Sequence, residues 1–250
     1  MPEPRIEDRD GVRWLTLDRP ATLNALTRPD LAVLTDAIET LPGDVGALVL
    51  RGAGERAFSS GVHVEVFDGM TSADARRFIT ELGGVMKAIR HAPVPSVCAV
   101  RGYCLGGAME IAMACDLRVA ATDAVFGMPE IAVGIPSVLD AALLPQHVGL
   151  SLAKEILLTG GLYPVETLAG TGFLNATIDP EHLDAAAADL AARVGRHSRP
   201  AIAAQKRLFE TWQEVGLGAG IAASIGEFAE AFAQPETAAS IAAYRTARGR

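Results

Sequence analysis

The chain has 250 residues, of which 50% are hydrophobic and 21% are charged, and this composition excludes a disordered protein. It carries 22 basic and 30 acidic side chains, a net charge of −8 with no basic stripe, so we expect no nucleic-acid partner. No apolar run reaches the length of a membrane span, and the charged N-terminus does not read as a targeting sequence. We therefore expect a cytoplasmic protein without membrane association, and the spacing of its three cysteines predicts no metal site.

Short apolar strands alternate with helices in the first two thirds of the chain. Strands are predicted at residues 12–17, 47–50, 95–100 and 117–121, and a helix at residues 29–41. Strands separated by helices are typical of an α/β fold with a parallel, crossover-connected sheet.

Helical patterns dominate the last third of the chain. They cover residues 181–196, 200–215, 221–232 and 235–247. We place the boundary near residue 195, between a core of residues 1–195 and a helical region of residues 196–250. The small-residue faces of these helices predict packing on the core or on a second subunit.

Two of the predicted strands end in the same way. One ends in Arg51-Gly52 and the other in Arg101-Gly102, and a glycine-bearing turn follows each, at Gly61 and at Gly106-Gly107. Ligands of open α/β layers bind outside the carboxyl ends of the strands, so both turns could face one site.

The segment 52–57 fits the G-x-G-x-x-A dinucleotide fingerprint on paper. That motif requires a long apolar helix immediately afterwards, and residues 58–61 instead form a second glycine turn. We therefore set the nucleotide interpretation aside.

Glu110 is the only charge in a predicted helix that is apolar almost all round and opens at Gly106-Gly107. A buried carboxylate is costly unless paired, which favours a functional role; complementing the helix dipole is an equally weighted alternative. The amides of the glycine pair suit a developing oxyanion, and a tight turn is the alternative there.

Glu130 is a second single acid in an apolar stretch, between Pro129 and Gly134. Two carboxylates in different environments can hold opposite protonation states and act as acid and base. A surface-loop glutamate is the ordinary alternative.

Taken together, these residues resemble the enoyl-CoA hydratase/isomerase (crotonase) family over nearly the whole chain. The matching segments are residues 15–20, 23–26, 57–61, 102–107, 126–131, 134–136, 158–160 and 172–175. The resemblance implies a spiral of ββα repeats with a C-terminal α-helical trimerisation region. It also implies an acyl-CoA thioester substrate, no metal or separate cofactor, and a homotrimer or dimer of trimers.

The resemblance also implies a set of site residues. The amides of Val62 and Gly107 would form the oxyanion hole, Glu130 would donate a proton to Cα, and Glu110 would polarise the water. Further substrate-binding positions are Ala25, Ser60, Gly61, His63, Gly106, Pro129, Ser137 and Asp140, with helix capping favoured for Ser137.

Three departures from the family pattern stand out. His63 occupies a position that is usually Asp, and the Ser137–Asp140 segment replaces a Gly-Gly pair. Lysines that often contact the CoA phosphates are replaced, so that role would fall to other cations. The replaced positions are Ala21 and Glu65, and the remaining candidates are Arg19, Arg28 and Lys206.

The favoured function is syn addition of water to a trans-2-enoyl-CoA. Alternatives are another crotonase-type reaction (double-bond isomerisation, decarboxylation or C–C cleavage) or a non-catalytic acyl-CoA binder.

Overall fold

Six strands form the larger of two sheets in the computed structural model, which describes residues 3–248. In spatial order they are β1 (Arg5–Arg9), β2 (Val12–Leu17), β3 (Ala47–Gly52), β5 (Ser96–Val100), β7 (Leu117–Ala121) and β10 (Ala176–Ile178). β1 is antiparallel to β2, and the remaining neighbours are parallel. Trp14, Val49 and Val97 lie side by side across three strands and are buried, which confirms the predicted covered sheet.

Four shorter strands form the second sheet. They are β4 (Ala57–Ser59), β6 (Tyr103–Leu105), β8 (Val125–Gly127) and β9 (Leu162–Pro164), and only β9 is antiparallel to its neighbour. β4, β6 and β8 each follow a strand of the larger sheet, so each turn of the chain supplies one strand to both sheets. This arrangement confirms the predicted spiral and brings the turns after β4 and β6 to the same edge.

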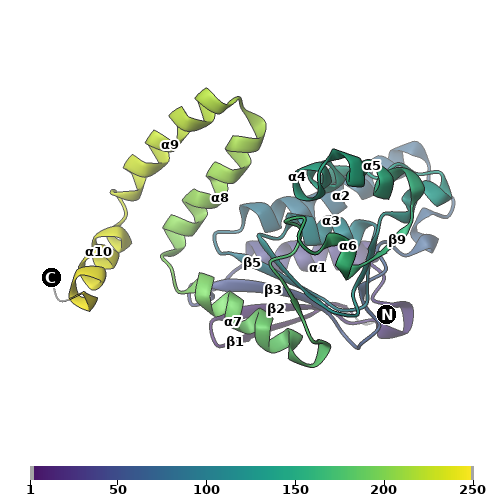
Figure 1. Ribbon diagram of the computed structural model, residues 1–250, viewed down its shortest axis with the longest axis horizontal. Helices are drawn as coiled ribbons and strands as arrows, with labels where there is room; N and C mark the ends of the chain where they lie inside the picture. The colour runs from purple at the N-terminus through teal and green to yellow at the C-terminus, as the bar shows by residue number, and fades with distance from the viewer. Residues whose placement is uncertain (1–2, 249–250) are drawn as a thin grey trace.

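Helices cover both faces of the larger sheet (Figure 1). The helices of residues 3–195 are α1 (Arg28–Glu39), α2 (Ser72–His91), α3 (Gly107–Ala114), α4 (Leu144–Val148), α5 (Leu150–Thr159), α6 (Val165–Leu168) and α7 (Leu183–Gly195). Short 3₁₀ helices are η1 (Pro20–Thr22), η2 (Val64–Phe67), η3 (Pro129–Val133), η4 (Leu139–Leu143) and η5 (Pro180–His182). α7 packs on one face, and α1, α2 and α3 lie on the other. None of the helices within residues 3–248 has the length and apolar character of a membrane span.

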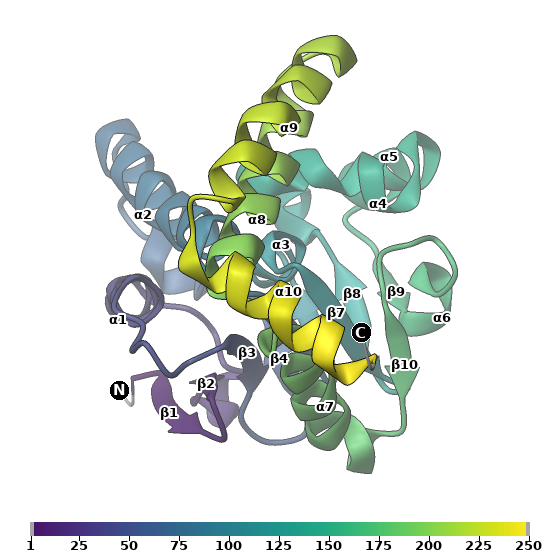
Figure 2. The same cartoon turned by 90° about the vertical axis from the view of Figure 1, so that its left-hand side faces the viewer.

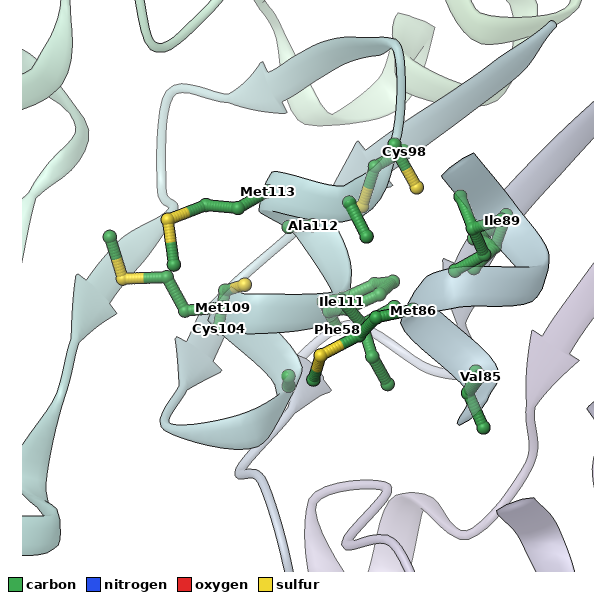
Figure 3. Packing of buried hydrophobic residues seen from close by; sticks show 14 of the residues in the cluster. Phe58, Val85, Met86, Ile89, Cys98, Cys104, Met109, Ile111, Ala112 and Met113 are labelled. Carbon is green, nitrogen blue, oxygen red and sulfur yellow. The ribbon is translucent and has the colours of Figure 1, made fainter. Parts of the chain in front are cut away.

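α3 is buried along its whole length, as its apolar sequence predicts. Figure 3 shows Ile111 of α3 among Phe58 of β4 and Met86 and Ile89 of α2, all within the larger core cluster. Because this core fixes α3 on every side, the N-terminus of the helix has a defined position relative to α2.

Three further helices lead away from the core (Figures 1 and 2). They are α8 (Arg199–Glu214), α9 (Leu217–Ala231) and α10 (Pro235–Ala247). α9 begins four residues before the predicted start, because Gly220 lies inside the helix rather than in a break. A Cβ at Gly220 would lie 3.0 Å from Cδ1 of Trp212, so this glycine permits the close approach of α9 to α8. The predicted boundary at residue 195 falls at the end of α7.

Candidate active site

A cavity of about 290 Å³ lies between α2, the N-terminus of α3 and the segment that follows β8. Its walls are largely apolar and come from η2, α2 and residues 132–138. The apolar lining includes Val62, Val64, Phe67, Phe78, Ile79, Leu82, Ala132, Val133, Ile135, Pro136 and Val138. Ser60, Ser137, Glu110 and Glu130 supply the polar side chains of the lining. An apolar cavity with a few convergent polar groups is typical of a small-molecule site.

The two glycine turns meet at one end of this cavity. Gly61 and Gly106 have φ angles of +87° and +53°, a region that glycine adopts without steric cost. A Cβ at Gly61 would lie 2.6 Å from the carbonyl oxygen of Leu105 and 3.4 Å from the amide nitrogen of Gly107. The expectation that both turns face one site therefore agrees with the geometry.

Val62 and Gly107 both line the cavity, and their backbone amides are candidate hydrogen-bond donors. Within residues 3–248 neither amide donates a hydrogen bond, because the β-bridge at Val62 uses the amides of Leu26 and His63 instead. Gly107 is the first residue of α3, where an amide has no partner inside the helix. Two unused donors at the positive end of a helix dipole can stabilise an oxyanion.

Glu110 lies one turn into α3 and is only 3% exposed. Its Oε1 atom is buried and has no hydrogen-bond partner among the described residues. Burial, the charge of Glu130 and the charge of Asp140 raise the pKa of Glu110 to about 8, although the backbone amides of Ala141 and Val138 favour its charged form. The surroundings of this carboxyl group therefore favour its protonated form.

Glu130 faces the glycine pair from η3. A Cβ at Gly106 would overlap its Oε1 atom, so the carboxylate packs directly on the glycine backbone. Ser137 Oγ donates a 3.1 Å hydrogen bond to Oε2. Burial raises the pKa of Glu130, while its own backbone amide and the Ser137 hydroxyl act in the opposite direction.

The two carboxylates thus flank the Gly106-Gly107 pair. A Cβ at Gly107 would lie 4.0 Å from Oε2 of Glu110, and one at Gly106 would overlap Glu130. The charge of Glu130 disfavours ionisation of Glu110, so the pair can hold and exchange a proton beside the two free amides.

The other expected substrate-binding residues divide into two groups. Ser60, Gly61, Gly106, Pro129 and Ser137 line the cavity. Ala25, His63 and Asp140 are not part of its lining. The carbonyl of Ala25 accepts from Arg19, His63 Nδ1 lies 3.7 Å from Glu65, and Asp140 forms an ion pair with Arg90.

Two expectations about single residues were wrong. Ser137 does not cap a helix, because Val138 precedes η4 and the Ser137 hydroxyl binds Glu130 instead. Arg19 and Lys206 are not exposed to a CoA phosphate: they are 8% and 5% exposed, and bind Asp30 and Asp116. Arg28 remains at the surface, in an ion pair with Glu81.

Sequence reasoning did not find Arg90, nor the amides of Val138 and Ala141 that face Glu110. No local pattern marks them, because the Arg90–Asp140 pair spans 50 positions. The part of the cavity wall on α2 could have been found from the sequence, because Phe78 and Leu82 are spaced to share one face of a helix. Residues 3–248 contain no cluster of three His, Cys, Asp or Glu side chains arranged to hold a metal ion.

Comparison with known proteins places these features in context. Residues 7–249 match the model of the family described as enoyl-CoA hydratase/isomerase. The short-chain-enoyl-CoA hydratase of Clostridium acetobutylicum is 28% identical over 242 residues, 96% of this chain and 93% of that protein. The crotonyl-CoA hydratase of Syntrophomonas wolfei is 32% identical over 181 residues, 71% of this chain and 70% of that protein.

Solved structures show the same fold. DspI of Pseudomonas aeruginosa superposes with a TM-score of 0.91 at 30% identity and covers 96% of this chain and 93% of its own. An enoyl-CoA hydratase of Mycobacterium smegmatis superposes with a TM-score of 0.90 at 28% identity, covering 98% and 96%.

Proposed function

The chain belongs to the enoyl-CoA hydratase/isomerase family, and from this premise we propose that it hydrates a trans-2-enoyl-CoA thioester by syn addition of water. The observation that carries the proposal is the placement of both Glu110 and Glu130 beside the unused amides of Val62 and Gly107. Relatives named as enoyl-CoA hydratases support it.

The thioester carbonyl accepts hydrogen bonds from the amides of Val62 and Gly107. As the water oxygen bonds to Cβ, the π electrons of the double bond move toward the thioester oxygen, and the enolate that forms is held by the two donors. One donor of this kind lowers the barrier by roughly 3 kcal/mol in other oxyanion holes. Backbone amides do this work, so the step needs neither a metal nor a separate cofactor.

The two glutamates carry out the proton transfers. Glu110 polarises the water, the pair accepts the proton that the water loses, and Glu130 delivers a proton to Cα. The raised pKa of Glu110 means that the unliganded pair already holds one proton at neutral pH. A water shared by both carboxylates lets this proton reach Glu130 before the bond to Cα forms.

Loss of the enoyl-thioester absorbance of crotonyl-CoA and longer 2-enoyl-CoAs tests the proposal. We expect turnover by the wild type and a collapse of at least 100-fold in Glu110→Gln and in Glu130→Gln, with thioester binding retained in calorimetry. Glu166→Gln, an exposed position on α6, serves as the matched control. No turnover at any chain length would reject hydration and direct product analysis to isomerisation, decarboxylation or C–C cleavage.

We further propose that the protein assembles as a homotrimer or dimer of trimers. Exposed apolar side chains recur along one face of α9, at Leu217, Ile221, Ile225, Phe228 and Phe232. A contiguous apolar face of this kind marks an interaction surface.

A cytoplasmic location is also part of the proposal, supported by three buried cysteines that form no disulfide.

A further inference from the structure

A chain of charged side chains runs from α8 to the segment that faces Glu110. Arg90, the penultimate residue of α2, donates through Nη1 to Oδ2 of Asp140 and through Nε to Oε2 of Glu210, the latter at 3.0 Å. Asp140 is 7% exposed, and the other two side chains are largely covered. Asp140 depends on this ion pair, because a carboxylate that is almost fully buried has little water to replace the lost bond.

The segment that contains Asp140 also has a strained backbone. Leu139 has a φ angle of +49°, a left-handed conformation that a branched residue rarely adopts. Its side chain packs on Gly83 of α2, where a Cβ would lie 3.0 Å from Cδ2. η4 is therefore attached to α2 at two successive residues, Leu139 through packing and Asp140 through Arg90. Strain of this kind persists only where surrounding contacts hold it.

The held segment is the one that contacts Glu110. The amides of Val138 and Ala141, on either side of Leu139-Asp140, favour its charged form, whereas the charge of Asp140 favours its protonated form. We propose, on the basis of the function above, that Arg90 is a positioning residue: through Asp140 it holds η4 against Glu110 and balances the negative charge beside that carboxylate.

The charges around Glu110 should make its pKa change in opposite directions in two variants. Glu130 faces it from η3 and Asp140 from η4, while Arg90 of α2 and Glu210 of α8 lie behind Asp140. Arg90→Met leaves the charge of Asp140 unbalanced, so the pKa of Glu110 rises. Asp140→Asn removes that charge and leaves Arg90, so the pKa falls. Mere loosening of η4 would withdraw the two amides and raise the pKa in both variants.

Titration of ¹³C-glutamate-labelled protein by infrared spectroscopy measures this directly, with Glu110→Gln identifying the band. We expect the midpoint to rise by about one pH unit in Arg90→Met and to fall in Asp140→Asn. Arg90→Lys should return it toward the wild-type value. Arg207→Met, which removes an ion pair between Arg207 of α8 and Glu227 of α9, should leave the midpoint unchanged.

A pH profile of kcat on a 2-enoyl-CoA gives the second readout. The alkaline limb, where the glutamate pair loses the proton that Glu110 holds, should shift in the same directions: upward in Arg90→Met and downward in Asp140→Asn. If the titration midpoint of Glu110 shifts in the same direction in Arg90→Met and Asp140→Asn, or does not shift in either, the proposed role of Arg90 is wrong. If the variants shift the midpoint as predicted but the wild type hydrates no enoyl-CoA, the proposed function is rejected and the role of Arg90 is not.

Discussion

The hydroxyl of Ser137 donates a 3.1 Å hydrogen bond to Oε2 of Glu130, seven residues earlier in the chain. This bond ties η3 to the segment that leads into η4. It also fixes the orientation of the Glu130 carboxylate: Oε2 accepts from Ser137, and Oε1 packs against Gly106. The carboxylate is therefore held from both oxygens.

Loss of the Ser137 hydroxyl should disturb both orientation and protonation of Glu130. In Ser137→Ala we expect kcat/KM on a 2-enoyl-CoA to fall by about tenfold or more, as for other bonds to charged groups. The hydroxyl favours the charged form, so its removal raises the pKa of Glu130 and shifts the acid limb of the pH profile, where the pair takes up its second proton, to higher pH. Ser137→Thr keeps the hydroxyl and should keep the limb in place; an unchanged profile in the alanine variant would contradict the role.

Gly106→Ala should abolish turnover while the protein stays folded. The new Cβ would overlap Oε1 of Glu130, and the φ angle of +53° adds a backbone cost of about 1–2 kcal/mol. Because the carboxylate must move away from its place beside the amides of Val62 and Gly107, we expect kcat to drop by at least about 100-fold. Steady-state kinetics together with urea unfolding would separate the two effects.

Gly84→Ala is the matched control for that substitution. Gly84 lies inside α2, and a Cβ there meets nothing within 4 Å. We expect unchanged turnover and a stability gain of roughly 0.5–1 kcal/mol, because alanine is the better helix former. Equal loss of activity in both variants would show that α3 and its glycine turn have no special place in catalysis.

The sequence and the structure agree where a local pattern carries the information. Continuous apolar runs mark the buried strands, and the repeated Arg-Gly ending at Arg51 and Arg101 correctly places two glycine turns at one edge. Long-range partners leave no such pattern. Lys206 binds Asp116, which lies 90 positions earlier in the chain. The residues next to Lys206 in the sequence do not distinguish it from a surface lysine.

The details of the site depend on backbone conformation more than on residue type. Ser137 resembles a helix cap in sequence, but the extended backbone of Val138 and the left-handed Leu139 separate it from η4. The protonation of Glu110 likewise follows from burial by α2 and η4, which the spacing of apolar residues on α3 alone cannot specify.

The apolar face of α9 predicts an assembly that one charge can break. Ile225 and Phe228 are about 70% exposed on the isolated chain, so a glutamate at either position would be harmless in a monomer. We expect the wild type to sediment as a trimer or hexamer and Ile225→Glu or Phe228→Glu to sediment as a smaller species. Leu158→Glu, at an equally exposed site on α5, should keep the wild-type assembly, and a monomeric wild type would contradict the proposed assembly.

The buried carboxyl of Glu110 should also make folding stability depend on pH. Its pKa is about 8 in the folded protein against an ordinary value of 4.5, so below pH 4.5 both states are protonated and the group costs nothing. As the pH rises from 4.5 to 8, the unfolded chain releases this proton and the folded protein keeps it. Stability therefore falls by up to about 1.4 kcal/mol per pH unit, and above pH 8 the loss stays constant.

Glu110→Gln removes this ionisation without removing the side chain. Summed over that interval the wild-type loss is on the order of 3–5 kcal/mol, so we expect the glutamine variant to be the more stable protein at pH 8, by an amount that shrinks toward pH 5. Urea unfolding at one-unit steps from pH 5 to pH 9 measures the difference, with Glu166→Gln as the exposed control. Parallel stability curves for the wild type and Glu110→Gln would mean that Glu110 ionises as an ordinary carboxylate. In that case the pair would hold no proton at neutral pH, and the proton for Cα would have to come from the attacking water alone.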